Sequence, residues 1–454
     1  MSYATLTTYE EAMKTFYLPD FQTALNHDTI LADMIDTNEK DVYGKEAKFP
    51  VAYGRSGGVG ARADGGTLPT AEYQKTKQVT LPMKYQYGTV YFTGPTIAAT
   101  RSNAGAYAAV IDNELTGIVR DLKKEFNRQM WGCGYGILAK WRSTGGATSY
   151  TVGQQYIPTT GATGFGAAFG DKYLKENGHA VPVVLGTSTS AIVSATVDAT
   201  DIAVTATART KGTENYATLT CTDPSVTEAA GTFYVRPGNM VTYDASNNTG
   251  GARLEMMGLR GIVTDEDLDE IALYDGGTNT SPHLDTLQGL DADTYSWWQA
   301  WVDSHSGGRY SATRNLEYNL MQEAFDEIEI AAGKDYGPDL ILTTHAIRRE
   351  YYAMCAADRR QVNTMTLDGG WSAIEFNGIA FTVDPDAIDG EIYFLTSKDL
   401  QVFRMSDYAW MEKDGSVLHR VSGKDAYEAV LFRYAEMGCY RRNSHGVLTD
   451  IYSA

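Results

Sequence analysis

A glycine-rich stretch is the first part of the sequence that could bind a ligand. Gly54–Gly66 reads Gly-Arg-Ser-Gly-Gly-Val-Gly-Ala-Arg-Ala-Asp-Gly-Gly, and glycine-rich loops can hold phosphate through backbone N–H groups. A phosphate-binding loop of this kind continues into Gly-Lys-Ser/Thr and a helix. The sequence after Gly66 contains neither the motif nor a helical pattern. We therefore interpret this stretch as a flexible loop between two strands.

An aspartate-rich loop is the second possible ligand site. Asp384–Gly390 reads Asp-Pro-Asp-Ala-Ile-Asp-Gly, which resembles a calcium loop. An EF-hand places acids at positions 1, 3 and 5, glycine at 6 and glutamate at 12. Here the third acid, Asp389, falls at position 6 and glycine at 7. We therefore expect a Pro/Gly turn whose carboxylates are solvated.

The remaining reactive side chains follow no pattern of a catalytic or metal site. No two of the seven histidines are four residues apart, and no Gly-x-Ser-x-Gly motif is present. The four cysteines are widely spaced, as is typical of reduced thiols. Cys133 follows the end of a predicted helix, where the helix dipole raises a thiol pKa. We predict no catalytic, cofactor-binding or metal-ligating residue, no cofactor, and no enzymatic activity.

Two further clusters have structural interpretations. The acidic run Asp265–Glu270 is typical of a solvated turn that opens a helix. Trp297, Trp298 and Trp301 indicate core packing rather than a ligand cage.

Length and composition limit the class of protein. The chain has 454 residues, which at about 150 residues per domain suggests roughly three domains. Apolar residues make up 43% and charged residues 21%, which excludes wholesale disorder. The net charge of −19 argues against a protein that coats nucleic acid. No segment has the pattern of a signal peptide or a membrane span, so we expect no membrane association.

The longest predicted element is an amphipathic helix. It extends from Ala104 to Trp131, with Ser102 or Asn103 as N-cap and Gly132 after its end. Its apolar positions follow the helical period: Tyr107, Val110, Ile111, Leu115, Ile118, Val119, Leu122, Phe126 and Met130. At 1.5 Å per residue it would be about 40 Å long, the length of a spine rather than of an ordinary globular helix.

Strand patterns surround this helix on both sides. The segments 48–53 and 78–93 predict a long two-stranded ribbon with the glycine-rich tip between them. Residues 144–274 are rich in Thr, Ala, Ser, Val and Gly, which predicts a small all-β domain. The last third predicts an α+β body with helices at 315–331 and 345–357, a hairpin at Asn377-Gly378, and strands at 339–344, 391–395, 400–404 and 427–433.

The order of these regions resembles the major capsid protein of tailed bacteriophages. That family has the Hong Kong 97-type fold, which encapsulin shells share. The resemblance covers most of the chain except residues 144 to about 243. It rests on an ordered set of motifs: Tyr85–Pro95, Phe126–Gly136, Pro338–Thr344, Trp410–Gly415 and Arg441–Gly446.

The resemblance implies an α+β fold with an inserted all-β domain. The implied parts are an N-terminal arm (1–44), an extended β loop or E-loop (45–97), a peripheral domain with the spine helix (98–143), the inserted domain (144–275), an axial domain with part of the peripheral domain (276–425) and C-terminal strands (426–454). Some members of the family crosslink through a Lys–Asn bond, but no such pair is assigned here.

The function that the resemblance implies is structural. We expect self-assembly through pentamers and hexamers into an icosahedral or prolate shell around double-stranded DNA. The expected partners are a portal, a separate scaffolding chain, decoration proteins and, through weak non-specific contacts, the DNA. The expected locations are the virion and, during assembly, the host cytoplasm. An encapsulin-like compartment and a secreted β-rich adhesin remain alternatives.

Overall fold

The computed structural model describes sixteen segments of the chain, which divides into two compact units. The described residues are 28–39, 42–95, 108–134, 136–146, 149–153, 179–184, 202–210, 216–221, 232–235, 254–265, 286–292, 294–305, 314–357, 364–366, 372–412 and 417–451. Unit 1 comprises residues 1–27, 87–125 and 408–433, and unit 2 comprises residues 28–86, 126–407 and 434–454. Most of the predicted arm and of the acidic run at 265–270 lies outside the described residues.

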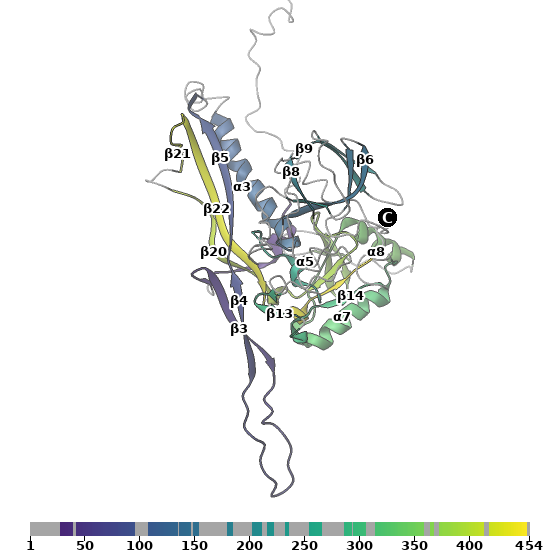
Figure 1. Ribbon diagram of the computed structural model, residues 1–454. Helices are drawn as coiled ribbons and strands as arrows, with labels where there is room; N and C mark the ends of the chain where they lie inside the picture. Colours follow the sequence, from purple (N-terminus) through teal and green to yellow (C-terminus); the bar gives the residue numbers. More distant parts are fainter. Residues whose placement is uncertain are drawn as a thin grey trace, which may run out of the picture. The chain divides into compact units, whose positions relative to one another are not determined.

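The described part of unit 1 consists of most of the spine helix, most of the strand before it and parts of the C-terminal strands, whose other residues belong to unit 2 (Figure 1). Their bounds are Lys84–Thr93 for β5, Ala108–Trp131 for α3, Leu400–Trp410 for β20, His419–Arg420 for β21 and Ala426–Cys439 for β22. The predicted helix is confirmed from Ala108 to its predicted end at Trp131, whereas its predicted start at Ala104 and the N-cap at Ser102 or Asn103 lie outside the described residues. Leu122 and Phe126 are buried, whereas Leu115 and Val119 are half-buried.

Strand β5 packs closely on α3 at a glycine. Its exposure alternates along the strand, as the sequence predicts. A Cβ atom at Gly88 would lie 2.9 Å from Cγ1 of Ile118, too close for any side chain. Glycine at this position therefore permits the close approach of strand and helix within unit 1.

The predicted ribbon belongs to unit 2 (Figure 1). Strand β3 (Glu46–Gly54) pairs antiparallel with β4 (Lys75–Pro82), and the short β2 (Val42–Tyr43) pairs with the first residues of β3. The predicted return strand at 78–93 is two strands, because the ladder of β4 ends at Pro82 and β5 pairs with β22 instead.

A seven-stranded mixed sheet forms the body of unit 2. Its order is β14 (Trp301–Asp303), β23 (Gly446–Leu448), β19 (Ile392–Leu395), β15 (Leu340–Thr343), β18 (Ile379–Val383), β17 (Ser372–Phe376) and β16 (Thr364–Thr366). One face packs on α7 (Tyr318–Ala332) and α8 (His345–Ala357). Leu340 and Leu342 on the other face join a second cluster that includes residues of the ribbon and of the end of α3.

Two local sequence signals in this body are confirmed. Thr344 caps α8, since the Ile347 N–H donates to its Oγ1 at 3.5 Å. Asn377 and Gly378 have φ of +50° and +80°, which are the left-handed values of a type I′ turn.

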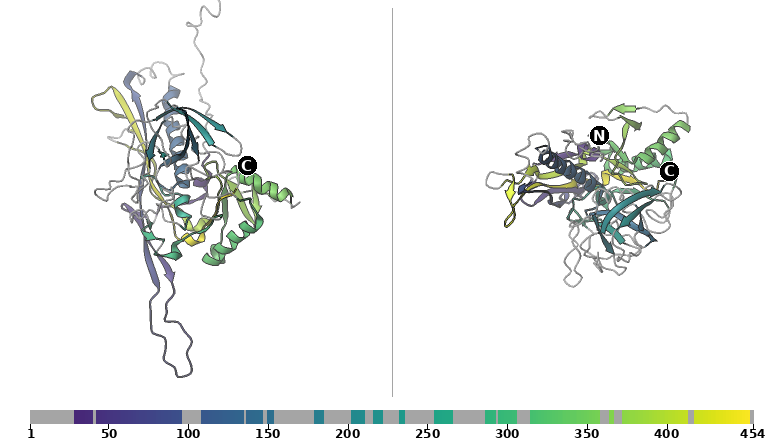
Figure 2. Two further views of the ribbon diagram at one scale, coloured as in Figure 1. Left: turned by 45° about the vertical axis from the view of Figure 1, so that its right-hand side comes forward. Right: turned by 90° about the horizontal axis from the view of Figure 1, so that it is seen from above.

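Six strands close into a barrel (Figure 2). They are β6 (Ile137–Gly146), β7 (Ser149–Gly153), β8 (His179–Val184), β9 (Ile202–Thr210), β10 (Tyr216–Cys221) and β11 (Thr232–Val235). The barrel begins seven positions before the predicted boundary at 144. Its first residue, Ile137, is the cross-strand partner of its last, Val235, so the chain enters and leaves the barrel at adjacent points.

The remaining described elements are short. Helix α1 (Ile30–Met34) leads to β1 (Asp36–Asn38), which pairs parallel with β20. The others are α5 (Leu259–Ile262), β12 (Thr286–Leu287), β13 (Leu290–Asp291) and the 3₁₀ turns at Ser296–Trp298, Lys334–Tyr336, Ser397–Asp399 and Arg442–Ser444. Of the helices in the described residues, none has the length and hydrophobicity to cross a membrane.

Candidate functional site

Three consecutive polar side chains at the end of α3 are buried. Asn127, Arg128 and Gln129 are 0%, 5% and 4% exposed, and a buried polar group is costly unless it is hydrogen-bonded. All three bond distant segments of unit 2: Asn127 bonds Ala32 and Asp386, whereas Arg128 and Gln129 bond the segment at 255–256. The last turn of the spine helix is therefore a junction, and we call these three residues the spine junction.

Asn127 and Asp384 together cap the start of helix α1. The N-cap residue Thr29 makes no capping hydrogen bond. Instead, the Leu31 N–H donates to Asp384 Oδ2 at 3.0 Å, and the Ala32 N–H donates to Asn127 Oδ1 at 3.1 Å. These are two of the N–H groups that the first turn of a helix leaves without an intrahelical acceptor. The cap thus comes from residues 95 and 353 positions away.

The aspartate loop is buried, so the expectation of solvated carboxylates is wrong. Asp384, Asp386 and Asp389 are 0%, 5% and 2% exposed. Asn127 Nδ2 donates to Asp386 Oδ2 at 2.7 Å, and Thr344 Oγ1 donates to Asp389 Oδ1 at 3.1 Å. Protein donors therefore replace water around these carboxylates. No group of three or more His, Cys, Asp and Glu residues in the described segments could hold a metal ion.

Arg128 and Gln129 bind the segment that precedes α5. Arg128 forms a buried ion pair with Glu255. Gln129 Oε1 accepts from Gln86 Nε2 at 2.6 Å and from the Met256 N–H at 3.3 Å. Gly258 then passes so close that a Cβ there would lie 2.4 Å from the Gln129 carbonyl oxygen, so only glycine fits.

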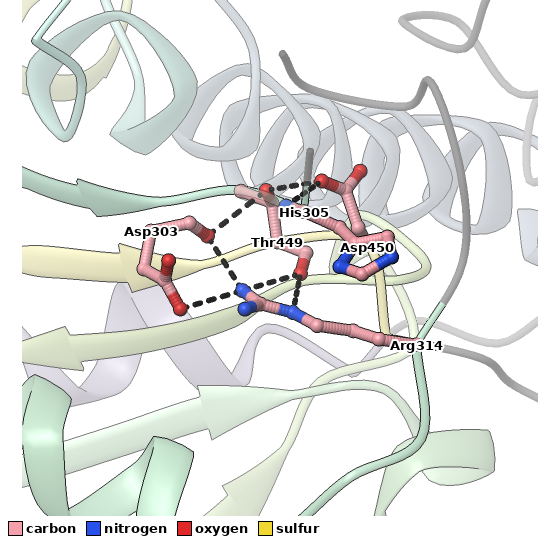
Figure 3. A network of polar contacts seen from close by, with 5 residues as sticks. All are labelled: Asp303, His305, Arg314, Thr449 and Asp450. Atoms are coloured by element: carbon pink, nitrogen blue, oxygen red, sulfur yellow. Dashed lines mark hydrogen bonds and ion pairs between the residues drawn. The ribbon is translucent and has the colours of Figure 1, made fainter. Parts of the chain in front are cut away.

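A second polar network fixes the C-terminal strand (Figure 3). Arg314 Nη2 forms an ion pair with Asp303 Oδ2 at 2.7 Å and donates to the Thr449 carbonyl at 3.2 Å. The His305 N–H donates to Asp450 Oδ2 at 2.8 Å. Asp450 is fully buried and has a φ of +66°. The network joins the end of β14, residue 314 and the end of β23.

A buried arginine and a buried tryptophan connect the C-terminal turn to the body. Arg442 donates from Nε to the Ile262 carbonyl at 2.8 Å and from Nη1 to the Trp298 carbonyl at 3.0 Å. Trp298 is 1% exposed, which confirms the core interpretation for this residue. Trp297 and Trp301 are half-buried, and Trp297 stacks on Tyr53 of β3.

His445 is buried in the same turn. Its side chain is 0% exposed, and burial lowers its pKa to about 3. Nδ1 accepts from the Thr396 N–H at 3.2 Å, and Nε2 has no hydrogen-bond partner among the described residues. An imidazole that accepts a hydrogen bond in a dry site is held in its neutral form.

The other reactive residues considered in the sequence stay apart from these networks. The glycine-rich tip lies between β3 and β4, as expected, and it is exposed. Cys133 is 1% exposed. Sequence reasoning missed the spine junction, although polar Asn127 beside apolar Phe126 and Met130 is a recognisable signal of a buried hydrogen-bonded group.

The chain is similar to solved structures, although no protein family and no curated protein matches it in sequence. The cyanophage A-1(L) capsid asymmetric unit is similar in structure, with 12% identity, a TM-score of 0.55, and coverage of 99% of this chain and 100% of that chain. The capsid of a native GTA particle has 7% identity, a TM-score of 0.46 and 100% coverage of both chains. The holo-SrpI encapsulin complex from Synechococcus elongatus has 8% identity, a TM-score of 0.43, and coverage of 100% of this chain and 97% of that chain.

The similarity to the cyanophage capsid defines the class of fold. It spans 99% of this chain and 100% of that chain, with a TM-score of 0.55. The chain therefore has a mixed helix-and-sheet fold of the phage capsid class. The resemblance noted from the sequence motifs is confirmed at the level of the fold.

Replacing Asn127 by leucine should destabilise the subunit. The change removes the acceptor of the Ala32 N–H and one donor to the Asp386 carboxylate, and an unsatisfied buried group costs about 1–3 kcal/mol. We expect a loss of about 2–4 kcal/mol in the free energy of unfolding, measured by urea denaturation. Gln322→Ala, which removes exposed hydrogen bonds on α7, is the control and should change little. Equal effects of the two changes would contradict the role of Asn127.

His445 should make the subunit sensitive to acid. Its folded-state pKa of about 3 lies below the unfolded value of about 6.5, so the unfolded chain binds the proton first. Stability is therefore complete above about pH 6.5 and is lost as the pH falls toward 3, by up to about 1.4 kcal/mol per pH unit. His445→Gln keeps an acceptor for the Thr396 N–H and should flatten this part of the profile in thermal melts. Parallel profiles of the two proteins would contradict the assignment.

Proposed function

We propose that this chain is the major capsid protein of a tailed phage, which self-assembles into a shell around double-stranded DNA. The observation that carries the proposal is the fold similarity to the cyanophage A-1(L) capsid over the full length of both chains. The shell forms through pentamers and hexamers. The role is structural, and we propose no enzymatic activity.

The parts of the chain correspond, in this proposal, to those of the Hong Kong 97-type fold. The E-loop is residues 45–97, the spine helix belongs to a peripheral domain at 98–143, and the axial domain is residues 276–425. The β3–β4 ribbon, the 24-residue helix α3 and the seven-stranded sheet support this assignment. Residues 1–44 are the arm and 426–454 the returning strands, and the insert, expected at 144–275, contains the barrel that begins at residue 137.

The surface of the ribbon supports self-association. Val59, Leu68 and Tyr73 are 87%, 81% and 83% exposed, more than any other large apolar side chain in the described segments. Apolar groups that gather on one exposed segment are typical of an interaction site. The ribbon thus has the surface of an element that a neighbouring copy covers.

The charge suits a container of DNA. A net charge of −19 disfavours tight binding of phosphate, so packaged DNA meets the wall through weak contacts only. The proposed partners are a portal, a separate scaffolding protein and decoration proteins. The proposed locations are the virion and, during assembly, the host cytoplasm.

The purified chain should assemble into closed particles. We expect shells in electron micrographs and a large species in sedimentation velocity, with the natural assembly partners added if needed. The ribbon should be accessible to trypsin after exposed Arg55 and Arg62 in free subunits and protected in particles. A chain that stays monomeric at every concentration and salt, even with its partners, would overturn the proposal.

The barrel should be removable. Because Ile137 and Val235 are cross-strand partners, a short Gly-Ser linker can replace residues 137–235 without separating the ends. We expect the variant to keep the helical circular dichroism signal of the remaining chain, and the isolated barrel to give a strand spectrum. Loss of the helical signal would mean that the barrel is required by the rest of the fold, contrary to an inserted domain.

A further inference from the structure

The base of the ribbon has an unpaired strand edge. The Thr80 N–H donates to the Gln288 carbonyl at 2.9 Å, so it points away from β3. In an antiparallel ladder the bonded and non-bonded pairs alternate. Lys48, Pro50 and Ala52, which lie opposite Thr80, Gln78 and Thr76, therefore direct their backbone groups away from β4.

Little of this edge is covered. Strand β2 pairs with β3 only at Glu46 and Ala47, and no other described strand pairs with this side of β3. The side chains of Lys48, Pro50 and Ala52 are exposed. Proline in the middle of a strand is compatible with an edge, because its missing N–H is not needed by the ladder.

A cavity of about 610 Å³ lies beside this edge. It is lined by Pro50–Tyr53, Trp297, Trp298 and Ala332 and, on its polar side, by Asp399, Tyr440, Arg441 and Asn443. Four consecutive residues of β3 line it, which is expected of a strand that presents its edge, since the side chains of one face alternate. Tyr53 and Trp297 stack with ring centroids 4.9 Å apart and give the cavity an apolar aromatic wall.

The second surface is the ribbon tip, residues 59–71. It is exposed chain outside the strand ladder, with a backbone hydrogen bond from the Gly66 N–H to the Ala63 carbonyl at 2.9 Å. Val59 and Leu68 at its two ends are more than four-fifths exposed. The tip thus exposes backbone groups and apolar side chains. The edge of β3 exposes backbone groups beside a cavity, so the two surfaces are complementary.

We propose that the ribbon tip of a second copy of this chain adds to the edge of β3 as an extra strand and places Leu68 in the cavity. The inference rests on the proposed assembly and specifies the contact that the ribbon makes. Strand addition of this kind gains affinity from main-chain hydrogen bonds and specificity from a pocket for a side chain.

The contact is head-to-tail. The tip and the edge are different surfaces of one chain, so each copy both offers a tip and receives one. Contacts of this type generate rings when the rotation closes, as the hexamers and pentamers of a shell require. The separate sites on each copy also allow the two halves of the contact to be altered independently.

Ala52→Pro tests the edge. It removes an outward N–H that the β3–β4 ladder does not use, so the subunit should fold normally. Ala52→Val, which keeps the N–H, is the matched control. We expect the critical concentration for assembly to rise at least about fivefold for the proline variant relative to the valine variant, as the loss of one hydrogen bond per contact implies. Equal critical concentrations with equal melting temperatures would overturn the proposal.

Crosslinking tests the partner. Subunits with Ala52→Cys are co-assembled with subunits carrying Leu68→Cys and treated with a short bis-maleimide. A dimer band should form in particles and not in dilute free subunits. The control pair joins Leu68→Cys with Tyr352→Cys, which is exposed on α8, and should give little product. Crosslinking of the control pair in place of the test pair, or no product in intact particles, would overturn this contact and leave the proposed assembly standing. A wild-type chain that forms no particles would instead overturn the proposed function.

Discussion

The fold of unit 2 depends on a helix cap that comes from distant parts of the chain. Helix α1 has five residues and no capping bond from its own N-cap, and so short a helix is marginal in water. Asn127 of the spine and Asp384 of the sheet body accept its free N–H groups. Asn127 also donates to Asp386, so one amide joins three segments. The start of the described chain is therefore held by the elements that form the core.

The other two residues of the spine junction also bond distant segments through buried side chains. Arg128 and Gln129 bind Glu255 and Met256, and Gly258 lets the backbone approach the helix end. Buried polar contacts of this kind add little net stability compared with apolar packing. They do restrict how the segments can be arranged, because a misplaced segment would leave several buried groups unsatisfied. The spine junction thus favours a single arrangement of the segments that meet at the end of α3.

The ribbon tip is exposed, whereas the residues of the spine junction are buried. Its lower half packs into the core through Phe49, Val79 and Leu81, whereas the tip at 59–71 is almost wholly exposed. The ribbon therefore joins a packed base to an exposed tip. The exposed apolar side chains of the tip are those on which the proposed contact between copies rests.

The sequence by itself determined the elements that depend on local physics. The period of apolar residues fixed the spine helix and its end at Trp131, the Thr344 cap fixed the start of α8, and Asn377-Gly378 fixed a hairpin. Only the tertiary structure decided which polar residues are buried and which groups they bond. Asp384 could be a solvated turn or a buried cap, and the choice depends on Leu31, which is 353 positions away. Hydrogen-bond partners at such separations leave no periodic trace in the sequence, because they are set by how the elements pack rather than by the conformation of neighbouring residues.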